Sequence, residues 1–171
     1  MGNLLFSPSG RIGPQAFMKG MMILAIISAL ITLTGLVNFQ LSQILGYASF
    51  LLVIPLFFLL IKRSHDAGRS GWMSIVWFIL WVVIWFVILS IAGAVMQTSA
   101  EQELATAMEE AMLGGGGLGE IMSLTKELGP QVAKETAART AISGVLGTAI
   151  SAFLINMLNK HEPNENRYGP A

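Results

Sequence analysis

The residues best suited to chemistry stand together in one polar stretch, residues 62–72, which interrupts a long apolar run. It contains His65 beside Asp66, and a histidine next to a carboxylate can act as a base or a pH sensor. Neighbouring residues on a helix point about 100° apart, so the two side chains need not touch. No serine nucleophile has a defined partner, and we expect no catalytic residue. We favour a structural role, in which His65 and Asp66 end a helix and bond to Arg63, Arg69 or the N-terminal arm.

The second half of the stretch, Gly68-Arg69-Ser70-Gly71, leads directly into an apolar run that begins at Trp72. Ser70 is a good N-cap residue. The free N–H groups of a helix N-terminus, with Arg63 and Arg69 nearby, can hold an anion. At a membrane surface this anion would be a lipid phosphate of an acidic leaflet. The alternative is a capped helix with interfacial arginines and no bound ligand.

Metal and cofactor chemistry finds little support elsewhere. The chain has no cysteine, so a thiolate metal site or a disulfide framework is ruled out. Thioethers can bind Cu(I), but Met96, Met108, Met112 and Met122 follow helical spacing, and methionine is a common filler of irregular packing. The glycine run 114–117 lacks the Lys-Ser/Thr that completes a nucleotide-binding loop. We therefore expect no metal and no cofactor.

The elements that position these residues are apolar helices. The chain of 171 residues is 54% hydrophobic and 12% charged, with a mean hydropathy of +0.67, whereas a soluble domain carries about 25% charged residues. About 20 apolar residues suffice for a helix to cross a ~30 Å hydrocarbon core. We predict an all-α integral membrane protein with four transmembrane helices, at residues 16–37, 41–61, 72–95 and 140–158.

The remaining segments connect these spans. They are an arm (1–15), a turn (38–40), a loop (62–71), an insertion (96–139) and a tail (159–171). The arm lacks the apolar core and cleavage site of a signal peptide, so we expect the first span to direct insertion into the membrane. The insertion holds seven glutamates and predicts two short helices, at 101–113 and 118–128. Gly129-Pro130 is expected to end the second of them and to start the next helix.

Charge predicts the orientation. Four spans put arm, loop and tail on one side, and that side holds seven of the ten Lys and Arg residues. Positively charged short loops stay in the cytoplasm. We therefore expect both termini in the cytoplasm of a bacterium, a multi-pass location in the inner (plasma) membrane, and the helical insertion on the exported side.

The last span carries small residues at helical spacing. Small residues let helix backbones approach closely inside lipid. The face that we predict to pack against a helix consists of Ser143, Gly144, Gly147, Thr148 and Ser151. With the exported insertion, this face favours a non-enzymatic accessory or scaffold subunit that binds other membrane proteins or itself. The alternative is a protein for anionic-lipid binding or small-solute transport that uses the basic loop. We expect membrane lipids as partners and no nucleic acid.

Three motifs together resemble the DUF805 family of small bacterial inner-membrane proteins. The first is Phe6-Ser7-Pro8-Ser9-Gly10-Arg11-Ile12-Gly13. The second is Arg63-Ser64-His65-Asp66-Ala67-Gly68-Arg69-Ser70-Gly71-Trp72, which is similar to the central signature of the family. The third is Asn166-Arg167-Tyr168-Gly169-Pro170. The resemblance covers the chain outside residues 96–139.

This resemblance implies a multi-span membrane protein and supplies no reaction. It also suggests that arm, loop and tail form one cytoplasmic cluster, in which Arg11, His65, Asp66, Arg69 and Arg167 meet. The residues that we assign to this cluster, or to a lipid-phosphate contact, are Arg11, Arg63, His65, Asp66, Gly68, Arg69, Ser70, Gly71, Trp72 and Arg167.

Overall fold

The computed structural model describes residues 5–169. Residues 1–4 of the predicted arm, Pro170 of the C-terminal motif and Ala171 lie outside the described residues. The helices are α2 (Pro14–Leu33), η1 (Thr34–Leu36), α3 (Phe39–Ser49), η2 (Phe50–Leu52), α4 (Val53–Asp66), α5 (Met73–Val95), α6 (Ser99–Leu113) and α7 (Leu118–Leu158), where η marks a 3₁₀ helix. Within 5–169 no strand forms, and the one isolated β-bridge joins Asn166 to Gly169.

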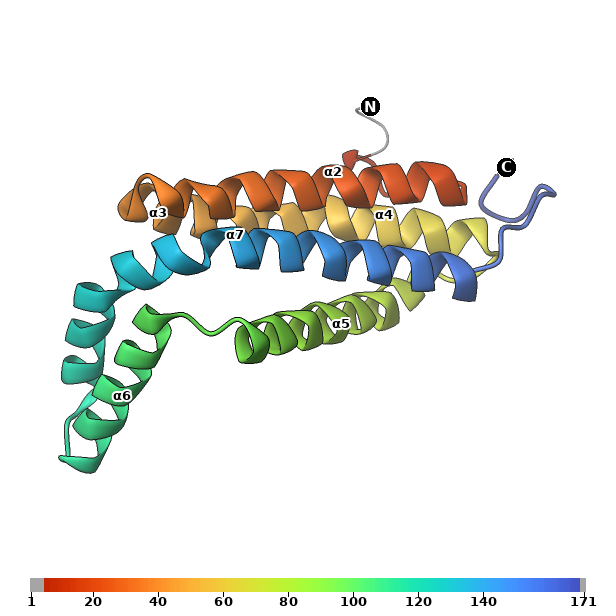
Figure 1. Cartoon of the computed structure of the whole chain (residues 1–171). Coiled ribbons are helices and arrows are strands. Elements are labelled where there is room, and N and C mark those ends of the chain that lie inside the picture. Colours follow the sequence, from red (N-terminus) through yellow and green to blue (C-terminus); the bar gives the residue numbers. More distant parts are fainter. Residues whose placement is uncertain (1–4, 170–171) are drawn as a thin grey trace.

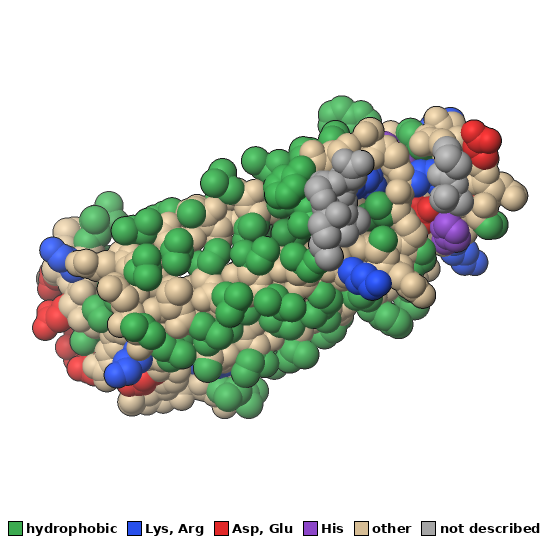
Figure 2. All heavy atoms as spheres, turned by 90° about the horizontal axis from the view of Figure 1, so that it is seen from above, with side chains coloured by type: hydrophobic (Ala, Val, Ile, Leu, Met, Phe, Trp, Pro, Cys, Tyr) green, Lys and Arg blue, Asp and Glu red, His purple; other side chains and the backbone are tan. Residues whose placement is uncertain are grey.

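Among the described residues, four helical segments are long and apolar enough to cross a membrane: Pro14–Leu36, Phe39–Asp66, Met73–Val95 and Leu118–Leu158. Large apolar side chains face outward on these segments; α5, for example, exposes Phe86 and Ile79. Figure 2 shows hydrophobic side chains over the middle of the molecule and charged ones gathered at its two ends. The protein is therefore an all-α membrane protein with four helices able to span the bilayer.

Figure 1 shows α2 and α7 running side by side, with α5 along the other side of α7, and α4 packs on α2 and α5. Helices α7 and α4 each pack against both α2 and α5, so the four helices form one bundle. Helix α6 and the first part of α7 form a helical hairpin, residues 99–128, which projects from one end of the bundle. We call this the hairpin end. The arm and the tail meet at the opposite end, the termini end.

Helix α7 is longer than the sequence predicts. It continues from Leu118 to Leu158 with Pro130 inside it, so the prediction that Gly129-Pro130 separates two helices is wrong. Proline removes one hydrogen bond and kinks a helix, and Figure 1 shows α7 changing direction between its hairpin part and its bundle part. The predicted short helix 118–128 and the predicted span 140–158 are two parts of one bent helix.

The predicted loop 62–71 is also shorter than expected. Residues 62–66 form the last turn of α4, and the connection to α5 starts at Ala67. Gly68 has φ +66°, a left-handed conformation that glycine adopts without steric cost and that commonly ends a helix. The prediction that Ser70 caps α5 is wrong, because Trp72 holds the N-cap position and no side chain caps it.

The small-residue face of α7 packs against α5 of the same chain. A Cβ atom added to Gly147 would lie 3.2 Å from the Cα of Trp85, tighter than most Cβ contacts, so glycine favours the close approach of the two helices. The indole Nε1 of Trp81 donates to the Thr148 hydroxyl at 3.3 Å. Ser143 and Ser151 are buried as well, and Gly144 lies beside the Trp85 ring. Gly144, Gly147 and Thr148 therefore pack against α5 within the chain.

A candidate binding site at the termini end

The buried apolar core of the bundle supports the termini end. The largest members without exposed surface are Phe17 and Met21 on α2, Leu59 and Leu60 on α4, and Ile155 on α7. They bring the last turn of α4, the start of α2 and the end of α7 together. The polar residues that follow Leu60 and Ile155 are thereby carried into one cluster.

Asp66 is the centre of that cluster. Its side chain is 1% exposed. The carboxylate accepts hydrogen bonds from the guanidinium of Arg63, one helical turn earlier, and from Arg11 of the arm at 3.5 Å. His161 Nδ1 lies 2.8 and 2.9 Å from its two oxygens. A buried carboxylate needs such partners because desolvation strongly disfavours an unpaired charge.

Arg63 joins α4 to the end of α7. Its side chain is 0% exposed. Besides Asp66, the guanidinium donates to Asn156 Oδ1 at 2.7 Å and to the main-chain oxygen of Asn159. The amide of Asn156 in turn donates to the Pro14 oxygen at 3.1 Å, which adds α2. A cation at the end of a helix satisfies its last carbonyl groups, so Arg63 fastens three helices at one point.

Arg11 ties the arm to the tail. Its guanidinium donates to the main-chain oxygens of Asn164 at 2.8 Å and Gly169 at 3.0 Å, and also to that of Glu162. Together with the bond to Asp66, these contacts hold the described part of the tail, residues 159–169, in a loop around one buried cation. Arm, α4 and tail therefore form one polar unit.

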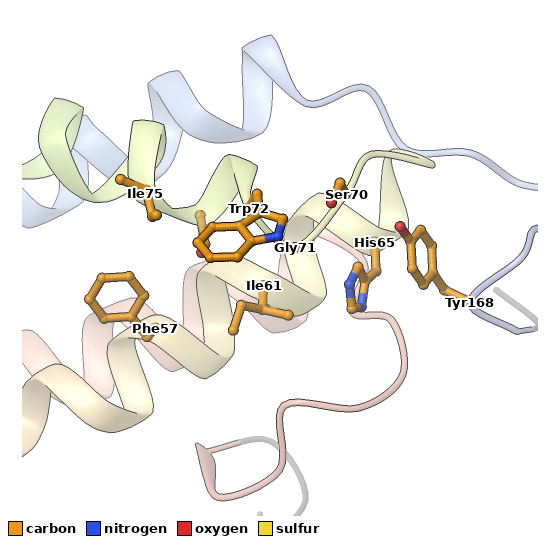
Figure 3. Close-up of a pocket in the computed structure, with 9 residues that line it drawn as sticks. Phe57, Ile61, His65, Ser70, Gly71, Trp72, Ile75 and Tyr168 are labelled. Atoms are coloured by element: carbon orange, nitrogen blue, oxygen red, sulfur yellow. The ribbon is translucent and has the colours of Figure 1, made fainter.

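His65 makes separate contacts with the arm and the tail. Its Nδ1 lies 3.3 Å from the Gly10 oxygen, and its ring stacks on Tyr168 with centroids 3.9 Å apart. The two rings lie face to face in Figure 3. The side-chain amide of Asn166 donates to the His65 oxygen at 3.0 Å. His65 thus fixes the tail from a second direction, and Asp66 pairs with His161 instead of with its neighbour in sequence.

Close packing makes Gly68 necessary in the α4–α5 connection. A Cβ atom added there would lie 2.7 Å from Glu162 Oε2. The same carboxylate accepts a hydrogen bond from the Asn166 amide at 2.8 Å. The glycine at position 68 therefore leaves space for the tail residue Glu162.

A surface hollow of about 550 Å³ opens beside this cluster, between α4 and α5. Its polar part is formed by His65, Ser70 and Tyr168. Its apolar part is formed by residues that Figure 3 draws along the two helices: Phe57, Ile61, Trp72 and Ile75. A hollow that is polar at one end and apolar along its length suits an amphiphilic molecule.

The structure separates the predicted cluster residues into two groups. Arg11, Arg63 and Asp66 lie in the buried polar unit. Arg69 lies instead over the ring of Trp77 on α5, with its Cζ 5.8 Å from the centroid. Arg167 lies over Tyr168 at 4.7 Å. Arg69 therefore does not join the network around Asp66, although the prediction placed it there.

Several residues of the cluster were not predicted from the sequence. They are Asn156, Asn159, His161, Glu162 and Asn164. Asn156 lies in the last turn of α7 and the other four follow its end, so that five polar side chains occur among residues 156–162. That density of polar groups beside a predicted span was a usable signal. Within residues 5–169, no group of three His, Cys, Asp or Glu residues is arranged to hold a metal ion.

The fold and this cluster define a multi-pass α-helical membrane protein whose two terminal segments are folded against the end of its bundle. The chain belongs to the DUF805 family: the family model described as "Protein of unknown function (DUF805)" matches residues 5–170. That range includes the insertion 96–139, which the motif resemblance alone left out. Neither the curated proteins nor the solved structures contain a significant match to the chain.

Proposed function

We propose that this protein is a non-enzymatic accessory or scaffold subunit of the bacterial inner membrane, with both termini in the cytoplasm and the hairpin on the exported side. The lysine and arginine excess at the termini end supports this orientation. The commitment of the Asp66 carboxylate to two guanidinium groups supports a structural role for that residue. The hairpin carries the binding function.

The observation behind this proposal is the exposed apolar tip of the hairpin. Met112 and Leu113 at the end of α6 are 59% and 82% exposed, and Leu118 and Met122 at the start of α7 are 80% and 71% exposed. Four large apolar side chains around one turn form a patch of the kind that marks interaction sites. Exposed glutamates flank it at positions 109, 110 and 120. The complementary partner offers an apolar pocket edged by lysine or arginine.

The hairpin is held in place on the bundle. Glu101 accepts two hydrogen bonds from the Arg139 guanidinium, at 2.5 and 2.8 Å, and these bonds lower the pKa of Glu101 to about 2. Arg139 also donates to the Met96 oxygen at 2.5 Å. Thr98 and Glu101 form a capping box at the start of α6. A preorganised element loses less conformational entropy on binding, which favours a docking role.

The test is co-purification from native membranes after crosslinking. The variant replaces Met112, Leu113, Leu118 and Met122 by serine, and the matched control replaces four exposed polar hairpin residues, Gln102, Glu103, Thr106 and Ser123, by alanine. We expect the tip variant to lose partners that the wild type and the control retain. Identical partners for all three proteins would overturn the proposal.

A second candidate function is the binding of an anionic amphiphile in the hollow between α4 and α5. This function is supported by the arrangement of the hollow, which has polar groups at one end and apolar side chains, including Phe57 and Ile61, along its length. Arg63 is buried and held by hydrogen bonds inside the protein. Arg69 and Arg167 are the sequence neighbours of the lining residues Ser70 and Tyr168, and we assign the contact with a phosphate to these two arginines. Native mass spectrometry should show an anionic lipid that is lost in Ser70→Trp, which fills the polar end. Glu165→Gln, on the exposed tail, is the control, and equal retention in both would refute this function.

A further inference from the structure

A second cavity, of about 420 Å³, lies inside the bundle and within the membrane-spanning part. All four spanning segments contribute to its wall. Met21 and Ala25 come from α2, Phe50 and Leu56 from the second segment, Trp81 from α5, and Gly144 from α7. The wall is predominantly apolar, and small residues on α2 and α7 make the space.

The polar groups of this wall are largely turned to their own helices. Thr32 Oγ1 donates to the Ser28 oxygen at 3.0 Å, and Ser49 Oγ donates to the Gly46 oxygen at 2.6 Å. The Trp81 indole donates to the Thr148 hydroxyl at 3.3 Å. A buried water needs two to four polar partners and about 30 Å³, so the volume would take on the order of a dozen waters. The polar side chains of the wall that remain are too few to bind that many waters in the cavity.

The cavity opens sideways into the surroundings of the bundle. Two of its lining residues, Phe50 on η2 and Val82 on α5, are 73% and 40% exposed. Helix α4 packs on α5, whereas α3 packs on α2 and α7. The opening therefore lies between η2 and α5, at a depth where a bilayer offers lipid chains.

We propose that this cavity holds an acyl chain of a bilayer lipid, which enters between η2 and α5. The occupant fits for three reasons: the wall offers dispersion contacts and few hydrogen bonds, the opening faces lipid, and an empty space of this size would forfeit packing energy. A methylene group is close in size to a water molecule, so a chain of about a dozen carbons fills the volume. The Trp81 and Trp85 indoles line the cavity and report on the chain.

The experiment uses the full-length protein with Trp72→Phe and Trp77→Phe, so that Trp81 and Trp85 remain, in nanodiscs of phospholipid brominated at mid-chain. Bromine quenches a tryptophan that it contacts. Gly46→Leu fills the cavity, since a Cβ atom at Gly46 meets open space. Gly93→Leu is the matched control, because Gly93 is a helical glycine with equal space that does not line the cavity.

We expect Gly46→Leu to lose part of the bromine quenching that the parent and Gly93→Leu show. Equal quenching in all three proteins would overturn the proposal, because the chains would then contact the tryptophans only from outside. If Gly46→Leu fails to fold, Ala29→Phe on the α2 wall replaces it, with exposed Ala48→Phe as control. A red-shifted emission insensitive to brominated lipid would show a hydrated cavity and also overturn it.

Discussion

The substitution Asp66→Asn should destabilise the protein strongly, because it leaves two buried cations without a counter-charge. The side chains of Arg63 and Arg11 are 0% and 2% exposed, and both bond to the Asp66 carboxylate. Asparagine is nearly the same size and can still accept a hydrogen bond. The perturbation is therefore the loss of one negative charge and not the opening of a cavity.

Removing one partner of a buried ion pair costs about 3–5 kcal/mol. Asparagine retains part of the hydrogen bonding, so we expect about 3 kcal/mol for Asp66→Asn. For a chain of this size each kcal/mol lowers Tm by a few degrees, which gives a drop on the order of 10 °C. The exposed tail residue Glu165 serves as control, because Glu165→Gln should stay within about 0.5 kcal/mol of wild type.

Thermal unfolding in one detergent, followed by circular dichroism, measures both variants. A double-mutant cycle adds Arg63→Met, which removes the cation most directly paired with Asp66. Since the second substitution removes one of the two uncompensated charges, the double variant should be more stable than the sum of the single losses predicts. A wild-type Tm for Asp66→Asn, or strictly additive losses, would refute the view of Asp66 as the electrostatic centre of the termini end.

Three further perturbations probe other parts of the structure. Glu101→Gln should lower the free energy of local unfolding of the hairpin by about 1 kcal/mol, because it weakens the pair with Arg139. The measurement is amide hydrogen exchange, which should become faster in the hairpin. The pKa of Glu101 is lowered from 4.5 to about 2, so this contribution is full above about pH 4.5 and is lost as pH falls towards 2. Gly68→Ala should lower Tm, since its Cβ would meet Glu162 in a left-handed conformation at a cost of about 1–2 kcal/mol. Gly147→Leu should separate α5 from α7 and lower Tm further.

Each of these variants has a matched control. Glu103→Gln removes an exposed glutamate from the same helix as Glu101 and should leave amide exchange unchanged. Gly93→Ala and Gly119→Leu place side chains where a Cβ atom meets open space, so they should keep the wild-type Tm within a few degrees. Equal effects of variant and control would contradict the assigned contacts.

The four spans were predictable because a helix that crosses lipid must be long and apolar, and such segments can be recognised from composition alone. The packing role of Gly147 was also predictable from the sequence, since small residues at helical spacing indicate that two helices approach closely. The continuity of α7 through Pro130 was not, because proline starts helices as readily as it bends them. Whether α7 continues through Pro130 depends on which helices pack beside it, and the sequence alone does not give that arrangement.

The termini-end cluster was predictable only in outline. The sequence indicated that arm, loop and tail share one side, and it singled out Arg11 and Asp66. It could not show that Asp66 pairs with His161, because that pairing depends on where α7 ends relative to α4. Arg69 was assigned wrongly for a related reason: the connection after Gly68 turns it towards Trp77.

The most direct test of the account is the membrane sidedness of the two ends. Because the chain has no cysteine, single substitutions Ser123→Cys in the hairpin and Glu165→Cys in the tail give clean probes for a membrane-impermeant maleimide. The account predicts that intact spheroplasts label Ser123→Cys at once and Glu165→Cys only after lysis. Labelling of both positions from the same side would contradict a bundle that spans the bilayer with the hairpin and the termini at opposite ends.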